Sequence, residues 1–349
     1  MLYYTPVMNV WNTLPRPFFV LAPMEAVTDV VFRHVIARAA PPDLYYSEFT
    51  NATGWVHAGE KAIRGRLVKT DDEKPIIAQI WGGEPGDMEA LARHCKKLGY
   101  DGIDINMGCP AKSAVKSGGA ALIRQPDLAI AAIKAAKSAG LPVSVKTRLG
   151  YSRTDEWRDW LTLLLQQDIA ALTIHLRSKK EMSKVPAHWE LMPDIVKLRD
   201  EIASQTLIVG NGDVRDRTHG LELVERYGCD GIMIGRGVFT DPFAFAKQIS
   251  DEQLSICDKL AIGNDQINCK SQTANLLPVA HRQLLIGLLQ YHLDLYDQYS
   301  TQTLRPYDTL KRFFKIYIRD FDGASELREK LMHTTSTNEV RTIIDEIEA

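Results

Sequence analysis

The sequence predicts an α/β protein in which a (β/α)₈ TIM barrel is followed by a small C-terminal all-helical bundle domain. Eight short apolar segments, rich in β-branched residues, precede residue 240 and alternate with helix-like stretches. The apolar segments are continuous runs, which is typical of parallel strands buried on both faces. Eight such units match a closed barrel, whose usual length is about 250 residues. A doubly wound open sheet is the alternative, but open sheets commonly use fewer units.

Glycine, proline or polar residues bound many of these segments, as they often do at the ends of regular elements. Strands are expected at 19–22, 44–49, 75–81, 102–106, 142–146, 171–175, 207–210 and 231–234. Helices are expected between them, among others at 88–98, 126–139, 155–167 and 218–227.

By composition the chain divides into four parts. These are an N-terminal arm at 1–17, the barrel at 18–250, a polar linker or surface loop at 251–275, and a helical domain at 276–349. In the helical domain apolar residues recur with a period of 3.6, which is typical of packed helices. Four helices are expected, near 278–300, 306–321, 323–332 and 336–347. Their lengths and spacing suit a small antiparallel bundle.

The overall composition is that of a globular protein. The 349 residues carry 42 Lys and Arg against 44 Asp and Glu, so a nucleic-acid partner would need a local basic patch. Five cysteines without C-x-x-C spacing argue against a disulfide framework and a structural zinc site. Residues 1–17 lack the features of a secretory signal, and no apolar run is long enough to span a membrane. We expect a cytoplasmic monomer with reduced thiols and no metal.

Polar residues stand at the C-terminal ends of successive expected strands, where barrels of this kind carry their active sites. One His or Lys at such a position is more often structural, but the repetition at matching ends favours a shared site. The residues are Pro23, Met24 and Glu25, then Gln79, Asn106, Cys109, Lys146, His175, Arg177, Asn211, Gly212, Asp213, Gly235 and Arg236.

The last two expected strands are each followed by glycine turns, at Gly210 and Gly212 and at Gly235 and Gly237. Glycine allows close approach of the backbone, so that N–H groups can surround an anion. Barrels commonly bind phosphate at these two loops, and Arg236 could add a charged donor. The pattern indicates a phosphorylated ligand, either a cofactor or a sugar phosphate.

The other strand-end residues suit a flavin ring. Gln79 and Asn106 offer amide groups for the pyrimidine edge, and Lys146 offers a cation that stabilises the reduced, anionic form. A Schiff base on Lys146 is the competing interpretation. Cys109 lies in a Gly-Cys-Pro turn at the active face, which favours a chemical role over inert packing, whereas Cys95 and Cys229 fit packing.

Five motifs together resemble the tRNA-dihydrouridine synthase family, in order and in spacing. They occupy residues 22–29, 104–112, 117–122, 145–150 and 235–237, and the most diagnostic is the Asn-Met-Gly-Cys-Pro segment followed by Ser-Gly-Gly. The motifs cover about residues 18–250, while the helical tail is similar in layout only.

The resemblance implies reduction of a uridine C5–C6 double bond in tRNA, with FMN that is reduced by NADPH or NADH. Cys109 would be the general acid that protonates C5. Asn106 and Arg177 would contact the substrate. FMN would be held by Pro23, Met24, Glu25, Gln79, Lys146, His175, Asn211, Gly212, Asp213, Gly235 and Arg236.

The helical tail carries a local surplus of basic residues between 305 and 319. Lys311, Lys315 and Arg319 are spaced by four residues, which would place them along one face of a helix, with Arg312 nearby. A solvated helix face is the simpler interpretation. In a chain of nearly neutral charge, however, the surplus favours contacts with tRNA phosphates.

The sequence departs from the family pattern in the loop at 178–189, after His175 and Arg177, so RNA contacts of this loop stay open. The role of the segment 47–51 is open as well. Two other functions also stay in play. One is an FMN-dependent barrel oxidoreductase for a small molecule, and the other is an RNA-binding protein that has lost catalysis. The modified position, the choice of tRNA and the preference between NADPH and NADH cannot be predicted from the sequence.

Overall fold

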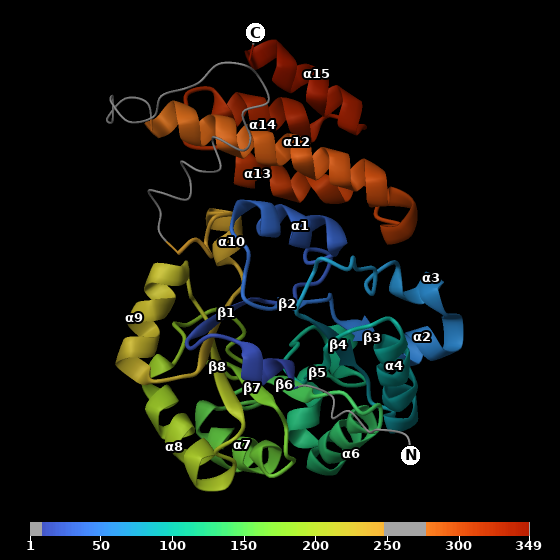
Figure 1. The fold of residues 1–349 in the computed structure, drawn as a ribbon, viewed down its shortest axis with the longest axis vertical. Coiled ribbons are helices and arrows are strands. Elements are labelled where there is room, and N and C mark those ends of the chain that lie inside the picture. Colours follow the sequence, from blue (N-terminus) through green and yellow to red (C-terminus); the bar gives the residue numbers. More distant parts are fainter. Residues whose placement is uncertain (1–8, 248–276, 349) are drawn as a thin grey trace.

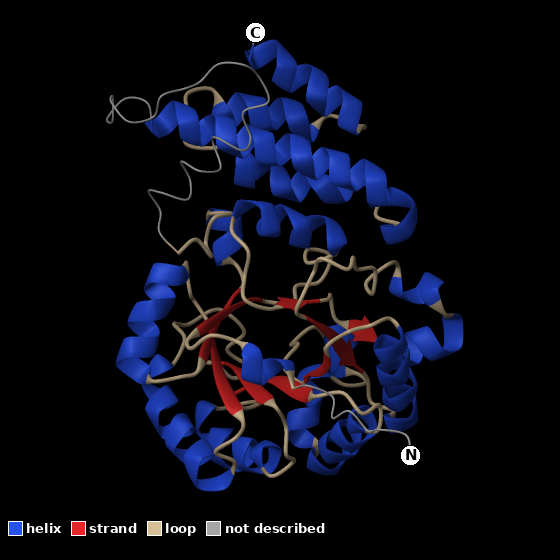
Figure 2. Cartoon of the chain, viewed as in Figure 1, coloured by secondary structure: helices blue, strands red, loops and turns tan. Residues whose placement is uncertain are grey.

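The computed structural model describes residues 9–247 and 277–348 and confirms the predicted barrel. Consecutive strands are parallel neighbours from β4 to β9, and β1 pairs with β9. A backbone bridge between Val20 and Leu44 brings β1 beside the second strand position, so the ring is nearly closed. Figure 2 shows the strands as a ring surrounded by helices. The strands are β1 Phe18–Leu21, β2 Tyr45–Tyr46, β3 Thr50–Asn51, β4 Ile76–Trp81, β5 Gly102–Asn106, β6 Val143–Arg148, β7 Ala171–His175, β8 Leu207–Asn211 and β9 Gly231–Ile234.

Helices follow the strands and cover the outside of the barrel, as predicted (Figure 1). The α-helices are α1 Val30–Ala39, α2 Ala52–Ala58, α3 Glu60–Ile63, α4 Pro85–Lys97, α5 Lys112–Val115, α6 Pro126–Lys137, α7 Trp157–Leu165, α8 Met192–Ile202, α9 Arg217–Tyr227 and α10 Gly237–Thr240. Their ends have local causes. The Asp216 side chain caps α9 by accepting the His219 N–H, and Gly228 ends that helix in the left-handed conformation, which glycine adopts without strain.

The expected strand at 44–49 is wrong in one respect, because it is split into β2 and β3. Between them, the side chains of Ser47 and Glu48 accept backbone N–H groups. The Ser47 hydroxyl accepts the Gln79 N–H at 3.0 Å, and the Glu48 carboxylate accepts the Ala26 N–H at 2.5 Å. These side-chain bonds interrupt regular pairing at this position.

The described part of the N-terminal arm closes the end of the barrel where the strands begin. Its short 3₁₀ helix, η1 Val10–Thr13, buries Trp11 completely against Phe18, with the ring centroids 5.9 Å apart. Val20, Leu44, Tyr46, Ile77 and Val209 belong to the same apolar cluster. The arm therefore completes a core inside the barrel, and the polar site lies toward the opposite end.

The C-terminal region is helical, as predicted, and packs beside the barrel on α1 (Figure 1). Its elements are α12 Leu277–Thr303, η5 Tyr307–Phe313, α13 Phe314–Tyr317, α14 Ala324–Met332 and α15 Thr337–Glu348. Phe32 of α1 lies 4.9 Å from Phe313, centroid to centroid, so barrel and tail share one apolar core. The predicted linker at 251–275 lies outside the described residues. None of the helices in 9–247 and 277–348 is long and apolar enough to cross a membrane.

The expected helix at 306–321 is wrong in its regularity. Residues 307–313 form a 3₁₀ helix, α13 ends at Tyr317, and Ile318 is extended. A 3₁₀ helix has three residues per turn, so residues four apart do not share its face. Lys311, Lys315 and Arg319 consequently do not lie along one α-helical face.

Buried charges also join the tail to the barrel. Arg305 donates to the fully buried Glu48 carboxylate at 2.5 Å and lies 3.9 Å from the Asp29 carboxylate. Arg312 donates to the Ala26 carbonyl at 3.1 Å, and Arg319 donates to the Thr240 carbonyl. Glu48 thus connects the loop after β1 to the tail.

Replacing Arg305 with methionine should leave Glu48 buried without its cation. Breaking a buried ion pair costs about 3–5 kcal/mol in unfolding free energy. Burial raises the pKa of Glu48 to about 7, and loss of Arg305 should raise this pKa further. The folded variant therefore holds a proton that the unfolded chain releases near pH 4.5, so its stability should fall as the pH rises from 5 to 8. Urea unfolding at both pH values measures this change.

The matched control is the double variant Arg305→Met with Glu48→Gln, in which position 48 carries no charge. It should recover much of the lost stability at pH 8 and show a smaller dependence on pH. An equal loss at pH 5 and pH 8 in Arg305→Met would show that Glu48 is not the cause.

Candidate active site

Lys146, His175 and Asn211 meet at the C-terminal ends of three adjacent strands, β6, β7 and β8. His175 and Asn211 are register partners, and the Lys146 ammonium donates to the Asn211 side-chain oxygen at 3.2 Å. The Asn211 amide donates in turn to the Met233 carbonyl at 2.9 Å. The structure therefore brings together three residues that the sequence predicted for one site.

The mouth of the barrel is rich in cationic groups. Burial, together with the nearby Arg148 guanidinium, lowers the pKa of Lys146 to about 8. Burial and the same guanidinium lower the pKa of His175 well below its usual value, so the imidazole is neutral at pH 7. Arg148 approaches the His175 Nδ1 atom at 3.4 Å. Because arginine only donates, Nδ1 is an acceptor and Nε2 carries the proton.

A buried carboxylate, Asp104, lies below these groups. It accepts the Gln79 Nε2 at 2.7 Å and the Ser144 hydroxyl at 2.6 Å, and the Gln79 Oε1 accepts the Asn106 amide at 3.0 Å. Burial raises the pKa of Asp104 to about 6. Asp104 is not among the residues predicted for the site. Its presence inside an apolar strand, two residues before Asn106, is the signal that could have found it.

Cys109 lies in the loop after β5, and its backbone is held in place from two sides. The Asn106 Oδ1 accepts the N–H groups of Gly108 at 3.1 Å and Cys109 at 2.9 Å, while Arg148 donates to the Gly108 carbonyl at 2.8 Å. The side chain is half-buried, and burial raises the pKa of the thiol. A thiol in this environment stays protonated at neutral pH.

Arg177, Asp213 and Arg236 form an ion-pair cluster beside the glycine turns. The Asp213 carboxylate accepts from Arg177, from Arg236 at 3.0 Å and from the Ala187 N–H at 3.0 Å. The Asp213 side chain is therefore occupied. Arg177 is almost fully buried, and its Nη1 atom has no hydrogen-bond partner within the described structure.

The loop after β1 contributes Pro23, Met24 and Glu25. Met24 lies beside the second glycine turn, since a Cβ on Gly235 would be 3.9 Å from its sulfur atom. Glu25 is exposed and its carboxylate pairs with Arg66. The side chain of Glu25 thus turns toward the segment after α3.

The four tail residues predicted to bind tRNA differ in their contacts. Arg312 and Arg319 donate to barrel carbonyl groups, as described above, and Lys311 pairs with Asp308 at 2.8 Å. Lys315 is exposed. Part of the predicted basic patch therefore serves the contact between tail and barrel.

Another group of basic residues lies on the loops after β5, β6 and β7, and the sequence analysis overlooked it. Tyr151 is flanked by Arg124 and Lys179, whose charged groups lie 4.1 and 4.7 Å from its ring centroid. The backbone N–H groups of Lys179 and Lys180 bond to the Gly150 and Tyr151 carbonyls, which fixes this part of the loop at 178–189. We call the following set the basic rim: Lys112, Lys116, Arg124, Lys179, Lys180 and Lys184. The consecutive pair at 179–180 was the available signal.

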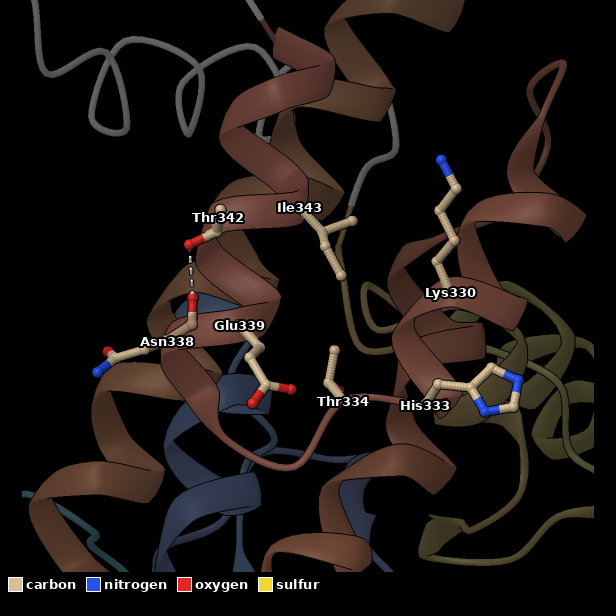
Figure 3. A pocket seen from close by; sticks show the side chains of 7 residues that line it. All are labelled: Lys330, His333, Thr334, Asn338, Glu339, Thr342 and Ile343. Carbon is tan, nitrogen blue, oxygen red and sulfur yellow. Dashed lines mark hydrogen bonds between the residues drawn. The ribbon is translucent and has the colours of Figure 1, made fainter.

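A hollow of about 450 Å³ lies in the helical tail, away from the barrel mouth (Figure 3). Its walls come from the end of α14 and from α15, and the Thr342 hydroxyl bonds to the Asn338 carbonyl at 3.1 Å. None of the residues predicted for the site lines it. Within 9–247 and 277–348, no group of three His, Cys, Asp or Glu side chains is placed to hold a metal ion.

Comparison with known proteins identifies related sequences along nearly the whole chain. The sequence model of the dihydrouridine synthase (Dus) family matches residues 20–348. "Probable tRNA-dihydrouridine synthase 2" of Bacillus subtilis (strain 168) is 52% identical over 343 residues, which cover 97% of each chain. "Probable tRNA-dihydrouridine synthase" of Staphylococcus aureus (strain MRSA252) is 50% identical and covers 98% of this chain and 96% of its own.

Among solved structures, the fold is similar to that of 2-naphthoyl-CoA reductase in complex with 2-naphthoyl-CoA. The TM-score is 0.50 at 10% identity, covering 68% of this chain and 50% of the reductase chain. At that identity the likeness concerns the fold alone.

The buried environment of Cys109 predicts slow alkylation at neutral pH. Iodoacetamide reacts with the thiolate, and a raised pKa lowers the thiolate fraction. The alkylation rate of the peptide containing Cys109, followed by mass spectrometry, should therefore rise at a higher pH than the alkylation rate of free cysteine. Free cysteine in the same buffer is the reference, and a midpoint at or below that of free cysteine would contradict the assigned environment.

Proposed function

Because the chain belongs to the dihydrouridine synthase family, we propose that it reduces the C5–C6 double bond of uridines in tRNA. The observation that carries this proposal is the position of a protonated thiol, Cys109, at the same barrel mouth as Lys146, His175 and Asn211. The hydride for C6 would come from bound FMN, reduced beforehand by NADPH or NADH. Cys109 then delivers the proton to C5.

The residues at the mouth fit an anionic flavin nucleotide. The unpartnered Nη1 of Arg177 and the exposed Arg236 provide donors for a phosphate, and Gly235 leaves its backbone open. Lys146 would hold the reduced ring's negative charge, and the Nε2–H of His175 provides a further donor. These features support FMN binding at the predicted residues.

Some of the predicted contacts to FMN need a different assignment. A phosphate would be repelled by the Asp213 carboxylate, so Asp213 would contribute its backbone N–H and hold both arginines in place. Asn211 and Gly212 would line the phosphate turn beside it. Pro23 and Met24 would flank the ligand, whereas Glu25 would act through its pair with Arg66. Gln79 would meet the ring only through the amide hydrogen that Asp104 leaves free.

Cys109 suits general acid catalysis because its thiol remains protonated at neutral pH. The Asn106 side chain fixes the Cys109 backbone, and Arg148 fixes Gly108 beside it. The substrate contact expected for Arg177 gives way to the phosphate role proposed above, because this side chain is almost fully buried and pairs with Asp213 beside the glycine turn.

For tRNA, we propose that the basic rim provides most of the phosphate contacts. Five of its six side chains are exposed, and they lie on loops around the mouth that holds Cys109. Electrostatic contact with phosphates supplies much of RNA affinity, and a folded RNA is recognised by shape. In the tail, Lys311 and Lys315 would add contacts, while Arg312 and Arg319 would act by docking the tail on the barrel.

The Cys109→Ala variant should separate binding from chemistry. It should still release FMN on denaturation, and NADPH should still reduce the bound flavin, because neither requires the thiol. Dihydrouridine formation from unmodified tRNA in a single turnover should fall by about 10²–10⁴-fold, as expected on loss of a positioned general acid. Cys229→Ala is the matched control, since that thiol is buried away from the mouth and its loss should affect stability only. An unchanged rate in Cys109→Ala would remove Cys109 from the mechanism.

The basic rim can be tested by charge reversal. Lys180→Glu with Lys184→Glu should weaken tRNA binding and lower the slope of log K against log salt by about 0.7–0.9 for each lost phosphate contact. Flavin content should stay normal, because neither side chain lies among the proposed FMN ligands. The comparison pair is Lys311→Glu with Lys315→Glu in the tail. If the tail pair lowers the slope more than the rim pair, the main phosphate contacts lie on the tail.

A further inference from the structure

A continuous series of hydrogen bonds leads from the interior of the barrel to the backbone of Cys109. Ser144 and Gln79 donate to the Asp104 carboxylate, at 2.6 and 2.7 Å, and Asn106 donates to Gln79 at 3.0 Å. The remaining oxygen of Asn106 accepts the N–H groups of Gly108 and Cys109, at 3.1 and 2.9 Å. We call this series the Asp104 network.

The direction of every bond in the network follows from Asp104. An ionised carboxylate only accepts hydrogen bonds, so Gln79 must present its Nε2 to Asp104 and its Oε1 to Asn106. Asn106 must then turn its Nδ2 toward Gln79, which leaves its oxygen to accept the backbone of the Cys109 loop. Asp104 and Gln79 are fully buried and Asn106 is nearly so, which leaves little access for water to replace a lost partner.

We propose that Asp104 is a positioning residue for Cys109, acting through the two amides that separate them. Only the expected effect of Asp104 on catalysis rests on the proposed function. The orientation of the loop itself is a property of the protein without substrate. Asp104 touches neither the thiol nor the proposed substrate position, and it determines which end of the Asn106 amide faces the loop.

The substitution Asp104→Asn keeps the shape of the side chain but no longer fixes the direction of the hydrogen bonds in the network. The new amide can donate to Gln79, in which case both downstream amides can reverse. A reversed Asn106 would present its NH₂ group to the N–H groups of Gly108 and Cys109, so three donors would face one another. The loop would then lose the two bonds that now hold it.

A second substitution should restore the direction without restoring Asp104. In the double variant Asp104→Asn with Gln79→Glu, the new carboxylate accepts from position 104 on one side and from Asn106 on the other. Ser144 can still donate, to the side-chain oxygen at position 104. The double variant keeps one negative charge near Lys146 and the original orientation of Asn106, whereas a merely structural role for Asp104 predicts no such rescue.

The primary measurement is the alkylation rate of Cys109 by iodoacetamide, at a fixed pH, in the purified full-length protein. Loss of a hydrogen bond that anchors the loop can change the equilibrium constant between the held and the released loop by up to about tenfold. Asp104→Asn should therefore speed alkylation of Cys109 by up to about tenfold, and the double variant should return the rate close to that of the wild type. Ser144→Ala is the matched control, because it removes one bond to Asp104 but leaves the direction of the network unchanged.

Dihydrouridine formation by pre-reduced enzyme is the second measurement, and it should fall in Asp104→Asn. Alkylation that changes as expected in a protein without dihydrouridine activity would overturn the proposed function but support the positioning role. Three outcomes would overturn the positioning role: alkylation unchanged in Asp104→Asn, alkylation equally fast in Ser144→Ala, or no rescue in a double variant whose melting temperature equals that of Asp104→Asn.

Discussion

Inside the barrel, polar side chains are removed from solvent, and those of the candidate site find hydrogen-bond partners on neighbouring strands. Leaving a buried polar group unpaired costs about 1–3 kcal/mol, so this constraint determines how the site is built. Lys146 is oriented by Asn211, and Gln79 is oriented by Asp104. The parallel register of the strands places Gln79 directly beside Asp104. It places Lys146 two positions before the level of Asn211, a distance that the long lysine side chain spans.

The same constraint governs the contact between the barrel and the helical tail. Glu48 is withdrawn from water and has to be neutralised, and Arg305 reaches it from the tail. The Glu48 carboxylate also accepts the N–H of Ala26, which follows the residues proposed to flank the flavin. A change in how the tail docks would therefore reach the first loop of the site directly.

Much of the fold could be predicted because the strands carry strong local signals. The strands at 102–106, 171–175 and 231–234 are confirmed to the residue. A glycine begins the first and the last of them, and large apolar residues recur in all three. The split of the second strand could not be predicted. It depends on partners of Ser47 and Glu48 that are distant in sequence.

The site residues on strand ends were predictable for a similar reason, because parallel strands bring their carboxyl ends to one edge. Basic residues in the tail were harder to interpret. Composition shows a charge but not its partner, and Arg312 and Arg319 turn to barrel carbonyls. Asp104 was not predicted for the site because the sequence does not show which groups a carboxylate in a buried strand contacts.

Trp11 has one more consequence for the proposed chemistry. With that indole filling the end of the barrel where the strands begin, the proposed FMN would be approached from the end that carries Cys109. A nicotinamide and a uracil would then compete for the same face of the same ring. The reduced or oxidised nicotinamide would have to leave before the uracil could bind. Reduction of the flavin and reduction of the uridine would therefore occur one after the other, as a consequence of how the barrel is closed.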